Sequence, residues 1–481
     1  MRHWLGEFLW FVWLLLAITG CGTGDRLERA LNEGQAALEQ GDPAAAVAAL
    51  DRAIEIDPRS LEAYVNRCAA ELGLQQYELA LADCSQALAL DPTSALALRQ
   101  RCAAQLGLDD LAAAVTDCTA NIQLDAEDGS AHAYRCEAYL KQGQDELAIA
   151  DCSRAIRLDP DLERAYYFRA SIHFFRRNLD QALADYDQAI ALDPDGATYN
   201  NRGLVLLSLG HLEEALADFS RTVELSPGMA TAHYNRGLAL AALGRVPEAV
   251  AAYGKALELD SSLSMAYYDR GIAHEKLGDF DSALEDYGHA IELDPNLGAA
   301  YNNRGALYAA EGQVQQAMAD LSEAIRLDPS MATAWANRGA LYRAAGMVER
   351  AVVDLDRAIE LNPGLARAYS DRGFALDELG RYDEALLDYG VALSLDPLLV
   401  VAYNNRAVTH LKLNQPAEAL ADLNRGIELS PTNANLYLLR GLAYEQSGNA
   451  ADAISDLERV LELTQNALLV EMAQAELEKL R

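Results

Sequence analysis

Residues 298–331 read GAAYNNRGALYAAEGQVQQAMADLSEAIRLDPSM, a stretch with two helical patterns and a turn signal between them. Each half carries small or apolar side chains at intervals of three and four residues, which places them on one face of a helix. The two stripes consist of Tyr301, Gly305 and Tyr308, and of Ala317, Leu321 and Ala324. Gly312 supplies permissive backbone for a turn, and the Leu-Asp-Pro ending at Pro329 stops the second helix. The stretch predicts a helix-turn-helix unit with its two stripes facing each other.

The same pattern returns along most of the chain. Leu-Asp-Pro or a close variant recurs at Pro58, Pro92, Pro160, Pro194, Pro227, Pro295, Pro329, Pro363, Pro397 and Pro431. The intervals are multiples of 34 residues, except that one residue is missing after Pro194. Ala126, Ser261 and Gln465 stand where the other prolines are expected. A fixed period of this length indicates a stack of identical units rather than several globular domains.

This 34-residue helix-turn-helix period resembles the tetratricopeptide repeat, and the resemblance covers residues 27 to about 467. Counting the proline as position 32 gives thirteen repeats over residues 27–467, followed by residues 468–481 as a polar-faced terminal helix that can cap the stack. The resemblance implies an all-α, right-handed superhelical solenoid. We call the first helix of each repeat helix A and the second helix B.

Small side chains mark the expected contact between the two helices of a repeat. Position 20 is Ala in all thirteen repeats, from Ala46 to Ala453, and position 8 is mostly Gly, Cys or Ala. Such residues let two helix backbones approach closely, and overfilling a packed contact costs roughly 1 to 3 kcal/mol. We therefore expect Ala317→Leu to destabilise the array.

A charged pattern runs beside this apolar face. Position 7 is Arg in twelve consecutive repeats, from Arg67 to Arg440, and position 23 is Asp in eleven of them. A partly buried guanidinium needs a partner, so the pattern predicts a ladder of Arg and Asp pairs with a structural role. The first repeat lacks both members, which favours pairing within a repeat and leaves pairing between repeats open. Ala252 leaves Arg236 without its aspartate.

Six cysteines occupy only positions 8 and 24 of repeats two, three and four. They form the sets Cys68 with Cys84, Cys102 with Cys118, and Cys136 with Cys152. In an exported chain an even set at fixed spacing indicates disulfides, here linking helix A to helix B within three successive hairpins. The alternative is that they are small buried thiols in place of Gly and Tyr. A metal site is not indicated, because there is no CxxC or close cluster of Cys and His.

The N-terminus differs from the rest of the chain. A short, weakly basic start precedes an apolar run from Phe8 to Thr19, and Cys21 follows small residues. This resembles a bacterial lipoprotein signal, which implies a signal peptide over 1–20, lipidation of Cys21, and a tether over 21–26. Gly22 after the cysteine implies the outer membrane under the usual sorting rule. An uncleaved anchor is the alternative, although the run of about twelve residues is short of the roughly twenty needed to span a bilayer.

Composition and motifs exclude several classes of function. The 39 basic and 73 acidic residues give a formal charge of −34, which repels nucleic acid and anionic lipid. The sequence has no HExxH, GxSxG, phosphate loop or dinucleotide fingerprint, and its eight histidines lack ligand spacing. We therefore expect no enzyme activity, no cofactor, no metal, no nucleic-acid partner and no small-molecule substrate, with membrane association by the lipid anchor only.

The resemblance also implies a binding surface. In tetratricopeptide arrays the stacked A helices line a concave groove through positions 2, 5, 9, 12 and 13, the usual peptide-binding face. The residues expected there are Tyr167, Phe174, Asn200, Tyr234, Tyr268, Asn302, Phe374 and Asn404. Asparagine amides can hold an extended peptide backbone while aromatic rings accept apolar side chains. Alternatively, several of these aromatics only pack against neighbouring A helices. The carboxylate clamp of the chaperone adaptors in this family is absent, since position 9 holds no Asn and position 5 no Lys.

The sequence thus predicts a non-enzymatic scaffold or adaptor that binds proteins or peptides from an anchored position in the bacterial cell envelope. Two alternatives stay open: an accessory or regulatory subunit of an envelope enzyme or of polysaccharide machinery, and a structural spacer.

Overall fold

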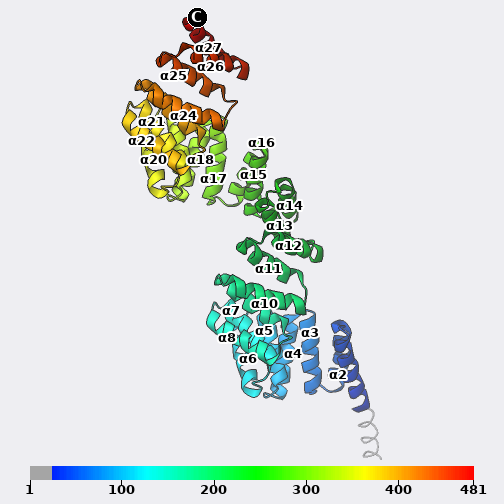
Figure 1. Cartoon of the computed structure of the whole chain (residues 1–481). Helices are drawn as coiled ribbons and strands as arrows, with labels where there is room; N and C mark the ends of the chain where they lie inside the picture. Colours follow the sequence, from blue (N-terminus) through cyan, green and yellow to red (C-terminus); the bar gives the residue numbers. More distant parts are fainter. Residues whose placement is uncertain (1–23) are drawn as a thin grey trace, which may run out of the picture. The chain divides into compact units, whose positions relative to one another are not determined.

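The computed structural model describes residues 24–481, and over this range the chain is helical, with no strand (Figure 1). The predicted all-α repeat solenoid is confirmed. The described chain divides into two compact units, one up to Gly244 and the other Arg245–Arg481. The boundary falls inside repeat seven, between its helix A and its helix B.

In the first unit residues 24–39 are helical. The helices that follow are α2 (Pro43–Ile56), α3 (Leu61–Gly73), α4 (Tyr77–Leu90), α5 (Ala95–Gly107), α6 (Leu111–Leu124), α7 (Gly129–Lys141), α8 (Asp145–Leu158), α9 (Glu163–Phe175), α10 (Leu179–Leu192), α11 (Gly196–Leu209), α12 (Leu212–Leu225) and α13 (Ala230–Ala242).

The second unit has the same alternation of helices. They are α14 (Val246–Leu259), α15 (Ser264–Leu277), α16 (Phe280–Leu293), α17 (Gly298–Ala310), α18 (Val314–Leu327), α19 (Ala332–Ala344), α20 (Val348–Leu361), α21 (Ala366–Glu378), α22 (Tyr382–Leu395), α23 (Val400–Lys412), α24 (Pro416–Leu429), α25 (Ala434–Gln446), α26 (Ala450–Leu463) and α27 (Ala467–Leu480).

Odd-numbered helices are the A helices of the repeats and even-numbered helices are the B helices. Within each unit a B helix packs against the A helices before and after it, and successive A helices also contact one another, as α5 does with α7 and α19 with α21. The A helices therefore line a continuous side of each stack. The last helix, α27, packs on α26 and α25; it buries Ala473 and Leu477 and leaves Leu468 64% exposed.

The core repeats with the sequence. The position-20 alanines are fully buried, and position 24 supplies a large side chain such as Tyr287, Leu355 or Tyr389. That side chain lies directly on the glycine at position 8: a Cβ placed on Gly271 would come within 2.8 Å of the Tyr287 ring. Glycine is needed here because the neighbouring ring occupies the space of any side chain.

The turn between helix A and helix B uses a left-handed residue at position 15. Nine of these residues are glycines, among them Gly312 with φ of 76°. Gln75, Asp109, Arg177 and Asn414 adopt the same conformation without being glycine, so the turn is set by the packing of the two helices as well as by the local residue.

The Arg and Asp ladder links atoms both within and between repeats. Arg304 donates from Nε and Nη2 to the two carboxylate oxygens of Asp320, at 2.7 and 3.0 Å, and the same bidentate pair recurs 16 residues apart along the chain. In several repeats Nη1 reaches back to position 25 of the preceding helix B, as Arg372 does to Asp356 at 2.6 Å. The predicted pairs of positions 7 and 23 therefore lie within a repeat, and the contact between repeats is made to a different residue, at position 25. Arg236 differs, since its buried Nε has no hydrogen-bond partner.

The predicted signal peptide, the predicted lipidation site Cys21 and the start of the predicted tether lie outside the described residues. From residue 24 onward, no helix is long and apolar enough to cross a bilayer.

Candidate binding face on the A helices

The three asparagines predicted to line the groove join neighbouring A helices. Their side-chain oxygens accept hydrogen bonds from an asparagine of the following repeat: Asn200 from Asn235 at 2.8 Å, Asn302 from Asn337 at 3.1 Å, and Asn404 from Asn435 at 2.8 Å. Their Nδ2 groups donate to Asn201, Asn303 and Asn405. An asparagine amide has two N–H donors and two acceptor lone pairs, so these bonds use only part of its capacity. The amides fix the register of adjacent A helices, and Asn200, Asn235 and Asn302 are themselves buried, with 8, 7 and 9% of their surface exposed.

Position 6, which was not among the residues predicted for the groove, also contributes hydrogen bonds along this face. Asn201 donates to the Tyr167 hydroxyl at 3.0 Å, and Asn303 donates to the Tyr268 hydroxyl at 3.4 Å. The sequence marks this position, because the tripeptide Asn-Asn-Arg recurs at intervals of three repeats. It begins at Asn200, Asn302 and Asn404. A tyrosine one repeat earlier is thereby tied to the asparagine pair.

The predicted aromatics are half-buried, and several pack inside the array. The Tyr167 ring lies edge-on to Tyr186 with centroids 6.0 Å apart, and Tyr268 lies 6.0 Å from Tyr287. Tyr167 and Phe174 border the core cluster around Tyr186. Burial raises the pKa of the Tyr167 and Tyr268 hydroxyls. These rings therefore contribute to packing and still present part of their surface.

Phe374 and Tyr234 have different surroundings. The Arg343 guanidinium of the preceding repeat lies 4.2 Å from the Phe374 ring centroid, a cation–π contact. Tyr234 is half-buried on α13. The predicted residues thus lie on seven A helices. Three of these helices, α9, α11 and α13, belong to the first unit, and four, α15, α17, α21 and α23, belong to the second.

A polar cluster near Asp377 was not foreseen. Asp377, on α21, is 3% exposed and accepts a hydrogen bond from Thr409 Oγ1 at 2.7 Å; it also forms an ion pair with Lys412 of α23. A buried carboxylate needs such compensation. No repeating signal marks these residues, since they occur in one pair of repeats.

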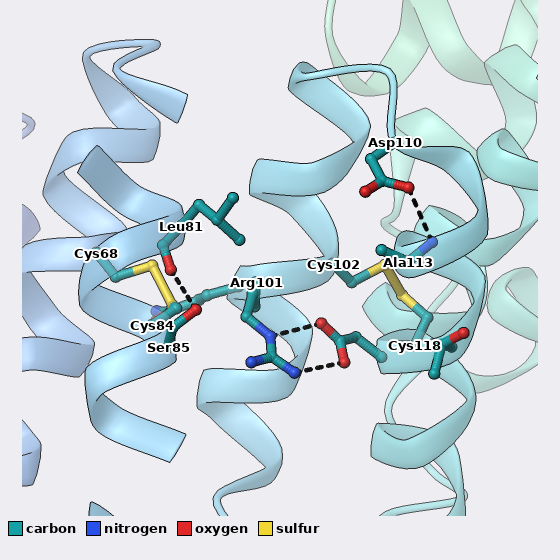
Figure 2. A network of polar contacts seen from close by, with 12 residues as sticks. Cys68, Leu81, Cys84, Ser85, Arg101, Cys102, Asp110, Ala113 and Cys118 are labelled. Carbon is teal, nitrogen blue, oxygen red and sulfur yellow. Dashed lines mark hydrogen bonds and ion pairs between the residues drawn. A yellow bond between two sulfur atoms is a disulfide. The ribbon is translucent and has the colours of Figure 1, made fainter. Parts of the chain in front are cut away.

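The six cysteines lie as three pairs, and Figure 2 shows two of them, Cys68 with Cys84 and Cys102 with Cys118. The Sγ atoms of Cys68 and Cys84, of Cys102 and Cys118, and of Cys136 and Cys152 lie 2.16, 2.15 and 1.98 Å apart, at bonding distance. All six are fully buried between helix A and helix B, where other repeats have a small residue and a large one. Figure 2 also shows the ladder pair of Arg101 and Asp117 beside them.

Residues 24–481 contain no group of three or more His, Cys, Asp or Glu side chains placed to hold a metal ion.

Comparison with known proteins places the repeats in a family. Models described as tetratricopeptide repeat match residues 31–95, 137–197, 167–230, 200–264, 264–297, 298–331, 332–365, 366–399, 400–433 and 434–466. A comparison with curated proteins gave no match.

Three of the solved structures to which this chain is similar are the following. The Cut9–Hcn1 hetero-tetramer of APC/C is 15% identical, with 95% of this chain and 96% of that chain covered and a TM-score of 0.47. Yeast Tom70 is 18% identical, with coverages of 94% and 99% and a TM-score of 0.37. YrrB, described as a TPR protein with an unusual peptide-binding site, is 24% identical, with coverages of 38% and 95% and a TM-score of 0.35.

The family models cover well over half of the chain, and the helical hairpins, the left-handed turns and the stacked A helices agree with them. The chain belongs to the tetratricopeptide repeat family, whose fold is that of a protein–protein interaction scaffold.

Proposed function

We propose that this chain is a non-catalytic adaptor that holds an extended segment of another protein along the A helices of one unit. The observation that carries the proposal is the row of asparagine amides tied across neighbouring A helices, as in Asn235 to Asn200 and Asn337 to Asn302, with half-buried aromatic rings beside them. Amides with unused donor and acceptor capacity suit a peptide backbone, and aromatic rings suit its apolar side chains.

Preorganisation favours this role over that of a passive spacer. An amide held by its neighbour loses little freedom when a ligand binds, and binding is weakened mainly by the cost of ordering groups. Asn200 and Asn302 also donate to Asn201 and Asn303, and these in turn donate to the Tyr167 and Tyr268 hydroxyls. A spacer has no need of polar groups kept in place on one side of the stack.

The proposed setting is the bacterial cell envelope, with the chain anchored by a lipid on Cys21. This rests on the apolar run before Cys21 and on the three cysteine pairs, since an oxidising compartment would keep them as disulfides. Metabolic labelling with a fatty-acid analogue tests the anchor. Label should be lost in Cys21→Ser, and label that persists in this variant would refute the anchor.

The binding role is tested by site-specific photo-crosslinking and affinity. A crosslinker placed at Tyr234 or Tyr268 should trap a defined partner, which mass spectrometry identifies, whereas one placed at exposed Leu147 on helix B α8 should not. Affinity for that partner should fall about tenfold or more in Tyr234→Ala and in Tyr268→Ala, each measured separately, and should be unchanged in Leu147→Ala. Melting temperatures check that each variant is folded. Equal affinity in all three variants would favour the structural spacer.

A further inference from the structure

Among the links that join one of the thirteen repeats to the next, the link between repeats five and six is one residue shorter than the others. The segment between a B helix and the next A helix normally has four residues, as in 294–297 between α16 and α17, but α10 and α11 are joined by Asp193–Asp195 alone. The residue lost is the last of the repeat, directly before helix A.

That last residue is apolar at the other junctions from Leu162 to Leu399, and it is polar at Ser60, Ser94, Asp128 and Asn433. At three of the apolar junctions it packs on the same buried cluster as a tyrosine of its own repeat: Leu297 with Tyr268, Met331 with Tyr301, and Leu399 with Tyr369. At the short junction Asp195 takes its place. Asp195 caps α11 by accepting hydrogen bonds from the backbone N–H groups of Ala197 and Thr198, at 2.7 and 3.1 Å. This junction therefore has a carboxylate where its immediate neighbours have an apolar side chain.

A pocket of about 260 Å³ lies at this place. Its lining consists of Glu163, Arg164, Tyr167, Phe168, Asp195, Ala197 and Thr198, from the first turns of α9 and α11. The rings of Tyr167 and Phe168 meet edge to face, with centroids 5.2 Å apart. Sites for drug-sized ligands are roughly 300 to 1,000 Å³, so this one is suited to a single side chain.

The charge in the pocket is negative and incompletely compensated. Glu163 is half-buried, and its carboxylate forms no hydrogen bond or ion pair within the described chain. Burial raises the pKa of its carboxyl group, and the nearby carboxylates of Asp195 and Asp193 raise it further. An added positive charge would relieve both effects.

The one cation in the wall is already engaged. Arg164 Nη2 lies 3.1 Å from Glu137 Oε2, and the guanidinium lies over the rings of Tyr134 and Phe168, at 5.1 and 5.6 Å from their centroids. Glu137 also pairs with Lys141 at 3.3 Å. Arg164 thus pairs directly with a different carboxylate, Glu137, and acts on Glu163 only through its nearby charge, which lowers the pKa of that carboxyl group.

We propose that this pocket takes the basic side chain, lysine or arginine, of a protein segment lying on the A helices, with its alkyl stem against Tyr167 and Phe168 and its cationic end at Glu163. Aromatic faces attract cations, and a half-buried carboxylate adds a direct charge pair. The inference rests on the proposed adaptor function and specifies one anchor of its ligand.

The test uses a probe that requires no natural partner, the acetylated and amidated peptide Gly-Gly-Lys-Gly-Gly, with the norleucine peptide as its uncharged match. Binding to the full chain is measured by saturation-transfer NMR observed on the peptide. The lysine peptide should bind at least fivefold more tightly than the norleucine peptide. Its binding should weaken at high ionic strength, because salt screens the charge pair.

Two variants locate the site. Glu163→Gln removes the charge without changing the shape, and Ala197→Leu, at an exposed position, fills the pocket. Each should weaken lysine-peptide binding about fivefold or more, whereas Glu213→Gln, an exposed glutamate on α12, should leave it unchanged. If Glu163→Gln does not fold, Ala197→Leu carries the test.

Equal binding of the two peptides, or lysine binding that survives both pocket variants, would overturn the proposal. Either result leaves the adaptor function standing, because partner affinity in Tyr234→Ala is measured separately. Conversely, a partner that ignores the aromatic residues of the A helices would refute the adaptor and leave lysine binding at Glu163 intact.

Discussion

At the scale of the residue, the contact between positions 8 and 24 shows how one space is filled in several ways. Gly271 accommodates the ring of Tyr287, Gly339 accommodates Leu355, and the Cys102 and Cys118 pair fills the same space with two sulfur atoms. The volume of the pair is kept while its chemistry changes, as expected for a close-packed interior. Either Gly or Ala occurs at position 8 opposite the same large residue, as Gly271 does opposite Tyr287 and Ala170 does opposite Tyr186.

This contact predicts a difference between two glycines of adjacent helices. A Cβ on Gly373 would lie 2.9 Å from the Tyr389 ring and 3.1 Å from the Ala385 carbonyl oxygen, whereas a Cβ on Gly390 meets nothing within 4 Å. Ala is a better helix former than Gly by about 1 kcal/mol, and overpacking costs about 1 to 3 kcal/mol. Gly373→Ala should lower the free energy of unfolding by about 1 kcal/mol, and Gly390→Ala should raise it by about 0.5 to 1 kcal/mol. Urea denaturation distinguishes them, and equal effects of the two substitutions would contradict the packing described.

A second residue-scale prediction concerns pH. Glu71 is 4% exposed, and its burial, with repulsion from Asp83, raises its pKa to about 7. A carboxyl group that is harder to ionise in the folded chain costs stability as pH rises from its unfolded pKa, near 4.5, through the folded one. Glu71→Gln should therefore stabilise the chain at pH 8 by at most about 3 kcal/mol and by much less at pH 5. Melting temperatures at the two pH values test this, and a gain independent of pH would contradict it.

At the scale of the element, the sequence allowed the two-helix repeat and its period to be predicted, because Pro at position 32 and Gly at position 15 interrupt a regular apolar pattern. It did not reveal that Gln75 and Arg177 adopt the left-handed turn, since their conformation follows from the packing of the helices on either side. It also left open whether the ladder arginines bond within or between repeats. They do both, as Arg372 shows with Asp388 and Asp356, because a guanidinium has donors pointing in two directions.

The three cysteine pairs give a prediction for individual hairpins. If they are oxidised, each closes a loop of 16 residues, for which a disulfide stabilises by about 3 kcal/mol. Chemical reduction should lower the melting temperature of the first unit and leave that of the second unit, whose described helices contain no cysteine, unchanged. Alkylation of the denatured chain without reductant should modify none of the six. Modification of all six in chain isolated from the envelope would show free thiols and contradict oxidation.

At the scale of the whole molecule, the side of the stack that carries the candidate site could be predicted from the repeat, whereas the state of its side chains could not. The asparagines lie on the expected helices, but whether their amides are occupied depends on the register between repeats, which joins Asn200 to Asn235 and Asn404 to Asn435. The pocket at Glu163 is lined by residues of α9 and α11 and of the short link before α11, and its volume follows from how these helices are placed, which the sequence does not give.

The most direct measurement is hydrogen–deuterium exchange of the full chain with and without its crosslinked partner. If the A helices hold an extended segment, amides of α9, α11 and α13, or of α17, α19, α21 and α23 in the second unit, should exchange more slowly in the complex, while the intervening B helices change little. Protection confined to B helices such as α10 and α12, with the A helices unchanged, would contradict the account.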